Sequence, residues 1–191
     1  MESEPGTWGC PSEPVPGGNV VTSRLEGTSS TREVMERQVT ADLFHELNPV
    51  TVRFAREHRR SLGLDQRSEQ VAHLIAVIAR DLFGGTWDIG AQVRASLGLD
   101  PWAAHDGLDD LVNRAHVLRK RINLSKDLEV DQTAQSGDRL DEQRQEPWKS
   151  SLPDAPIRFV VFPGMGSRGH VLVKQQVYTV SLQEARARAR N

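Results

Sequence analysis

The chain has 191 residues, a length that suits one compact domain with terminal extensions, or at most two small domains. Hydrophobic residues make up 37% and charged residues 26%, which is more polar than an average globular domain but unlike a disordered chain. No apolar run is long enough to cross a bilayer, the N-terminus does not resemble a signal peptide, and the single Cys10 excludes a disulfide framework or a Cys-based zinc site. We therefore expect an intracellular protein, cytoplasmic by default, with no membrane partner.

Residues 1–29 are rich in Gly, Pro, Ser and Thr, and four prolines interrupt any helix there. Such a segment has little apolar surface to bury, so we predict a disordered N-terminal arm. Trp8 is the one side chain of this arm that could anchor to a partner.

Residues 30–124 carry the pattern of a helical domain with about five helices. A capping box at Ser30–Glu33 and apolar residues at a spacing of four from Met35 to Leu47 predict the first helix. Asn48-Pro49 fits the N-cap and first position of a second helix, which Gly63 ends.

The remaining helices of this domain are also marked by their ends. Residues 68–83 are apolar on every side, which predicts a third helix at the buried centre. Asp88 can cap a short fourth helix over 89–97 that Gly98 closes. A fifth helix is expected over 106–123 from its apolar spacing.

The C-terminal third changes character twice. Residues 125–156 are polar and read as a linker, whereas residues 157–191 predict a β-hairpin followed by a basic C-terminal tail. A lone hairpin is marginal in water, so it must pack on the helices or pair with another chain. The predicted fold class is therefore mainly α with a C-terminal β-hairpin, or more loosely α+β.

The net charge of −2 hides local patches of both signs. Residues 81–113 hold six acidic side chains against Arg94 alone, residues 114–126 hold five basic side chains and no acidic one, and residues 127–147 are acidic again. Alternating blocks of this kind favour a protein that uses charged patches for interaction.

A glycine-rich segment after the first expected strand of the hairpin offers a candidate anion-binding loop. Its sequence matches the pattern G-x-G-x-x-G-x-V of protein kinases, in which backbone N–H groups can cradle phosphates. A strand rather than a helix follows, so the dinucleotide-binding version of the motif does not fit. The plainer interpretation is a hairpin loop that needs positive φ angles. The candidate residues are Gly164, Gly166, Ser167, Arg168 and Gly169.

No catalytic constellation emerges from the sequence. The six histidines are never three or four positions apart, so no local pair forms a metal clamp, and His45-Glu46 lacks the second histidine of a zinc-protease motif. We accordingly predict no enzymatic activity, no metal and no cofactor. An enzyme with unrecognised chemistry is the third class left open.

Three basic clusters are the candidate contacts for phosphate or nucleic acid. They comprise Arg53, Arg56 and Arg60 in the second helix, Arg119, Lys120 and Arg121 at the end of the fifth, and Arg186, Arg188 and Arg190 in the tail. The second cluster also complements its helix dipole. We expect a non-enzymatic interaction or regulatory protein that engages a protein partner through charged surface patches. The alternative is a nucleic-acid-binding accessory protein that contacts the phosphate backbone through these clusters.

Overall fold

The computed structural model describes residues 20–59, 62–64, 68–85, 88–100, 102, 104–149, 151–180 and 186. The chain divides into two units, residues 1–36 and 37–191, and the architecture below is that of the second. Residues 1–19 of the expected N-terminal arm, Trp8 included, lie outside the described residues. Residues 20–29, also expected in that arm, belong to the first helix, α1.

Helix α1 runs without interruption over Val20–His58, so the two helices predicted on either side of Asn48-Pro49 are one. Its buried residues recur every three or four positions straight through the proline: Thr40, Ala41, Phe44, Leu47, Thr51, Phe54 and Ala55. This continuous apolar stripe holds the helix together, although proline removes one backbone hydrogen bond. The predicted boundary at Asn48 is wrong, and the described residues form four helices rather than five.

The other helices follow the prediction closely. They are α2 (Ser68–Phe83), α3 (Ile89–Leu97) and α4 (Asp106–Leu124). The side chain of Asp88 caps α3 by accepting from the Ala91 N–H at 2.9 Å. Helix α2 contacts α3, α4 and β3, and its Ile75 and Ile78 are fully buried. No described helix combines the length and apolar character that crossing a membrane requires.

Six short strands complete the fold. They are β1 (Leu128–Asp131), β2 (Gln145–Pro147), β3 (Phe159–Phe162), β4 (Gly164–Ser167), β5 (His170–Val173) and β6 (Gln175–Tyr178). One sheet has the order β1-β4-β5 and is antiparallel throughout. The other has the order β2-β6-β3, with β2 parallel and β3 antiparallel to β6. The segment 125–156, expected as a linker, thus supplies β1 and β2, and four strands replace the single C-terminal hairpin. The fold is α+β.

The glycine-rich segment is a strand and a tight turn rather than a loop. A Cβ at Gly164 would lie 2.8 Å from the Val173 carbonyl oxygen, so β4 needs glycine to approach its neighbours. The turn to β5 consists of Arg168 and Gly169, with φ values of 50° and 81°. Two consecutive residues with positive φ match the tight hairpin turn that fits strand twist.

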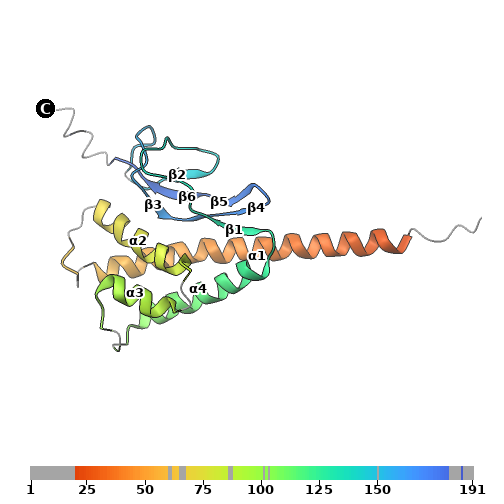
Figure 1. Ribbon diagram of the computed structural model, residues 1–191, viewed down its shortest axis with the longest axis horizontal. Coiled ribbons are helices and arrows are strands. Elements are labelled where there is room, and N and C mark those ends of the chain that lie inside the picture. The colour runs from red at the N-terminus through yellow and green to blue at the C-terminus, as the bar shows by residue number, and fades with distance from the viewer. Residues whose placement is uncertain are drawn as a thin grey trace, which may run out of the picture. The chain divides into compact units, whose positions relative to one another are not determined.

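The β2-β6-β3 sheet packs on the helices through an aromatic cluster. The ring of Phe44 on α1 lies 5.1 Å from Phe83 on α2 and 5.6 Å from Phe162 on β3. Figure 1 shows both sheets on the same side of the helical layer. The sequence left open whether this segment packs on the helices or pairs with another chain. In the structure, β3 packs on α2.

Candidate functional site

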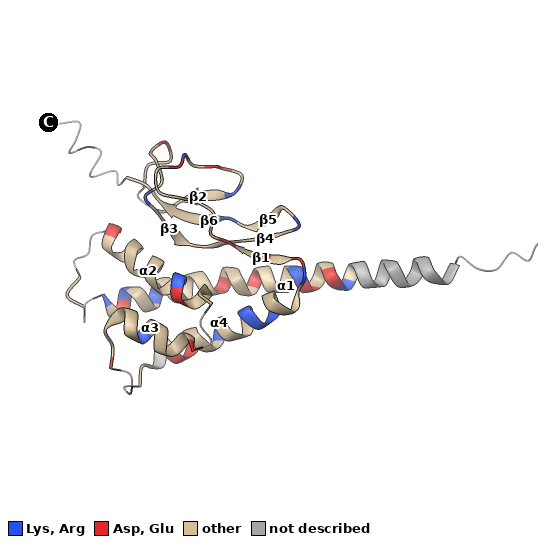
Figure 2. Cartoon of the chain, in the orientation of Figure 1, with Lys and Arg blue, Asp and Glu red and all other residues tan. Residues whose placement is uncertain are grey.

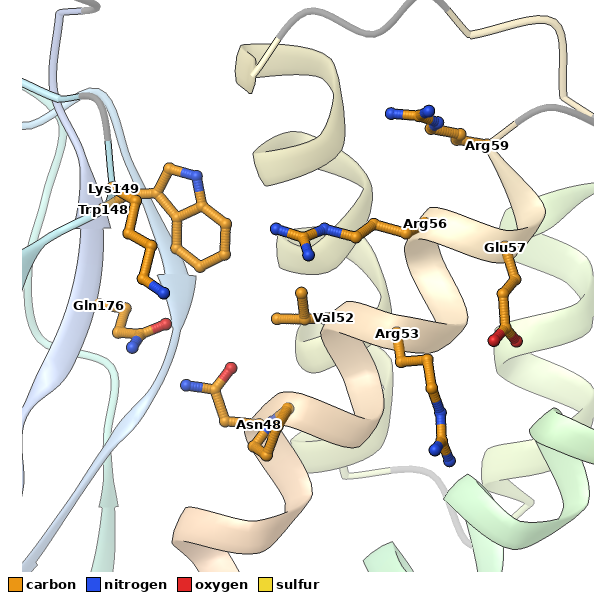
Figure 3. A pocket seen from close by; sticks show the side chains of 10 residues that line it. Asn48, Val52, Arg53, Arg56, Glu57, Arg59, Trp148, Lys149 and Gln176 are labelled. Atoms are coloured by element: carbon orange, nitrogen blue, oxygen red, sulfur yellow. The ribbon is translucent and has the colours of Figure 1, made fainter.

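A groove of about 770 Å³ lies between the C-terminal part of α1 and the segment around β2 and β6 (Figure 3). It is lined by Asn48, Pro49, Val52, Arg53, Arg56, Glu57, Arg59, Trp148, Lys149 and Gln176. We call it the Trp148 groove.

Helix α1 supplies the basic wall. Its apolar stripe is buried against the rest of the fold, so the opposite side of the same turns faces solvent. Arg53, Arg56 and Arg59 are spaced three apart and therefore lie on neighbouring turns of that side. Val52 is half-buried at the edge between the two sides.

Strand pairing fixes the opposite wall. Trp148 follows β2, and its backbone N–H donates to the Val177 carbonyl on β6 at 2.7 Å. Gln176 lies on β6 directly beside Glu146 of β2. The Gln176 Nε2 donates to Glu146 Oε1 at 2.8 Å. The indole and the Gln176 amide are thus held on one sheet.

Side chains from the two walls point toward one another. Figure 3 shows Arg56 extending from α1 toward the indole of Trp148, with Val52 below it. The amides of Asn48 and Gln176 face each other across the lower part of the groove, whereas Glu57 lies on the far side of the helix. The groove therefore offers an aromatic surface beside a guanidinium group.

The charge of the three groove arginines is not compensated within the described chain. Arg53, Arg56 and Arg59 form no ion pair with any described residue. Several arginines elsewhere do, as in Arg94–Asp109 at 3.2 Å, Arg114–Asp110 at 3.0 Å, Arg144–Asp131 at 2.8 Å, Arg158–Glu69 at 2.9 Å and Arg168–Asp127 at 2.7 Å. An anionic group entering the groove would therefore not have to displace an existing partner.

Two buried acceptors also lack a hydrogen bond within the described part of the chain: the side-chain oxygens of Asn48 and Gln176. The Gln176 orientation is fixed, because turning the amide over would place its oxygen against the Glu146 carboxylate. A buried acceptor without a donor costs free energy that a ligand donor can recover.

The structure brings only part of the predicted basic residues together. Arg53 and Arg56 line the groove, whereas Arg60, Arg188 and Arg190 lie outside the described residues and Arg186 is exposed. Arg119, Lys120 and Arg121 lie near the end of α4. Figure 2 shows the basic C-terminal end of α4 and that of α1 at opposite ends of the helical layer.

The candidate anion loop is placed differently from the expectation. Gly164, Gly166 and Ser167 are buried in β4, and only Arg168 and Gly169 form the exposed turn. The Arg168 guanidinium donates to Asp127 at 2.7 Å and holds the pKa of that carboxyl below its usual value. The Arg168 guanidinium is therefore already paired with a carboxylate of the same chain.

A second cavity, of about 240 Å³, lies between α2 and β3. Its lining is mostly apolar, and the guanidinium of Arg80 at its edge already contacts the buried Asp81 at 3.2 Å. The described residues contain no cluster of three or more side chains able to hold a metal ion. The Trp148 groove is the better candidate because its arginines Arg53, Arg56 and Arg59 form no ion pair with a described residue.

The sequence did not identify Asn48, Arg59, Trp148, Lys149 or Gln176 as site residues. Trp148 carried the one available signal, as the single aromatic residue of a polar segment. Nothing local marks Gln176, because its role depends on strand pairing. Comparison with known protein families, with curated proteins and with solved structures found no match.

Proposed function

We propose that this chain is a non-enzymatic interaction protein that binds an acidic segment of a protein partner in the Trp148 groove. The observation that carries the proposal is the unpaired charge of Arg53, Arg56 and Arg59 on the α1 wall, with Arg56 extending toward the indole of Trp148. Arginine and tryptophan are the residue types most enriched where binding energy concentrates. The planar guanidinium also matches a carboxylate with two parallel hydrogen bonds.

The lining suits binding rather than bond-making chemistry. It combines cations, two amides, an indole and Val52, and its one carboxylate, Glu57, lies away from the opposite wall. Such a surface can pair with anionic side chains and cover an apolar one at the same time. An acidic segment that carries an apolar residue fits both features.

Nucleic-acid binding is the alternative, supported by the aromatic ring next to cations, an arrangement that single-strand binders use to stack bases. Two observations favour a protein partner. The cluster in the groove and the cluster on α4 lie at opposite ends of the helical layer and do not form a continuous basic stripe. The chain as a whole has a net charge of −2, which would repel a long polyanion.

The test is a fluorescence anisotropy titration with two labelled probes. One is an eight-residue peptide of Glu and Asp with two Leu residues, and the other is a single-stranded DNA oligonucleotide of equal charge. Replacing Arg53, Arg56 and Arg59 by Gln should weaken peptide binding about tenfold, because three exposed pairs at about 0.5 kcal/mol each amount to about 1.5 kcal/mol. The matched control replaces Lys120, Arg121 and Arg139, three exposed cations outside the groove, and should bind as the native chain does.

Each outcome decides between the candidates. Tighter binding of the oligonucleotide than of the peptide, lost in the groove variant, would replace the proposal by the nucleic-acid alternative. Equal losses in the groove variant and the control would show that the interaction follows total charge and not this site. Peptide binding lost in the groove variant alone supports the proposal.

A further inference from the structure

The Trp148 groove contains an acceptor whose orientation is known. Gln176 Oε1 is buried and accepts no hydrogen bond from a described residue, while its Nε2 is held by Glu146 at 2.8 Å. Figure 3 shows the oxygen directed from β6 toward the wall formed by α1. A ligand in the groove would therefore meet an acceptor here and not a donor.

We infer that the partner segment lies in the groove as an extended peptide and that one of its main-chain N–H groups donates to Gln176 Oε1. This inference rests on the proposed function and adds how the segment is held. A main-chain N–H occurs at every residue except proline, so it is the donor that an acidic segment always offers. Carboxylate side chains and phosphodiester groups carry no such donor.

An extended conformation reconciles this hydrogen bond with the rest of the lining. Successive side chains of a strand point to opposite sides, so neighbouring residues meet different surfaces. One residue can place its carboxylate on Arg56, while the next packs against Trp148 and Val52. In a helical segment the main-chain N–H groups are already bonded within the helix, except in its first turn.

Backbone N-methylation tests the hydrogen bond directly. The acidic peptide described above is synthesised in versions that each carry one N-methyl group, which removes one donor without changing charge. With the native chain, one version should bind about three- to tenfold more weakly than its neighbours, as expected for one hydrogen bond. This measurement needs no protein variant, so a folding defect cannot obscure it.

The variant Gln176→Met completes the test, because it keeps the length of the side chain and removes the acceptor, together with the Nε2 donor to Glu146. This variant should bind the unmodified peptide about three- to tenfold more weakly. N-methylation at the sensitive position should not weaken its binding any further. Gln143→Met, at an exposed glutamine outside the groove, is the matched control and should behave as the native chain does.

The possible failures can be distinguished. If no N-methyl position weakens binding and Gln176→Met binds normally, the inference is wrong, whereas loss of binding in the arginine variant would still support the proposed function. If sensitivity to N-methylation persists in Gln176→Met, another group accepts the bond and the inference is also wrong. If the native chain binds no acidic peptide at all, the proposed function and the inference fall together.

Discussion

The guanidinium of Arg144 donates to Asp131 Oδ2 at 2.8 Å and joins the end of β1 to the turn before β2. The other oxygen of Asp131 accepts from the Thr133 hydroxyl at 2.7 Å and from Gln175 Nε2 at 2.8 Å. One carboxylate thus connects three segments of the sheet region. Acidic side chains of residues 127–147 thus form ion pairs and hydrogen bonds within the fold. These contacts explain why a polar segment is ordered.

The first prediction concerns the pH dependence of this connection. Burial raises the pKa of Asp131, but hydrogen bonds from Thr133 and Arg144 outweigh it and hold the pKa below its usual value. A carboxyl with a lowered folded pKa stabilises the fold above its unfolded pKa, and the contribution is lost as pH falls through the folded value. In urea titrations, Asp131→Asn should therefore be less stable than the native chain at pH 7, with a difference that shrinks below about pH 4.

A matched control for this prediction is Asp154→Asn, at an exposed aspartate with no described partner. It should leave the urea midpoint unchanged at both pH values. A destabilisation of Asp131→Asn that stayed the same from pH 7 to pH 3 would show that the charge of Asp131 is not what stabilises the fold.

The continuity of α1 leads to a second prediction. Pro49 is exposed and lies inside the helix, so replacing it by Ala restores a backbone donor without removing buried contacts. We expect Pro49→Ala to raise the free energy of unfolding by about 1–3 kcal/mol. If a helix instead began at Asn48, proline would be favourable at its first position, and Pro49→Ala would be neutral or destabilising. The shift of the thermal midpoint separates the two arrangements.

Close approach of strands gives a third prediction, at Gly164. The added methyl of Gly164→Ala would meet backbone atoms of Val173 and Gln175 at 2.8 and 2.9 Å, and backbone cannot move aside cheaply. We expect a loss of about 1–3 kcal/mol in the free energy of unfolding, typical of overpacked sites. Gly85→Ala, where nothing lies within 4 Å, is the control and should be close to neutral. Similar urea midpoints for the two variants would contradict the described packing of β4.

The sequence predicted the helices whose limits depend only on neighbouring residues, through apolar spacing and capping. The limits of α2 and α3 follow from their apolar patterns, with Asp88 and Gly98 marking the two ends of α3. It did not predict α1 as one helix, because the local preference of Pro49 for a helix start is overridden by packing at Phe44 and Phe54. Strands of three or four residues are too short to show an alternating pattern, so β1 and β2 were not recognised.

The candidate site was predictable only on one wall. The spacing of Arg53 and Arg56 indicates a shared face, and this is where the structure places them. The opposite wall comes from Trp148 and Gln176, roughly a hundred positions later in the chain. Periodicity reports which residues share a face of one element. It carries no information about which distant element that face will meet.

The most direct test of the account is an NMR titration of the tryptophan indole groups with the acidic peptide. The signal of Trp148 is assigned as the one missing in Trp148→Phe, and Trp102, whose residue is 93% exposed in the loop between α3 and α4, serves as the internal control. We predict that the Trp148 indole N–H signal shifts in a saturable manner while that of Trp102 stays in place. A peptide that binds without moving the Trp148 signal, or that moves Trp102 instead, would contradict it.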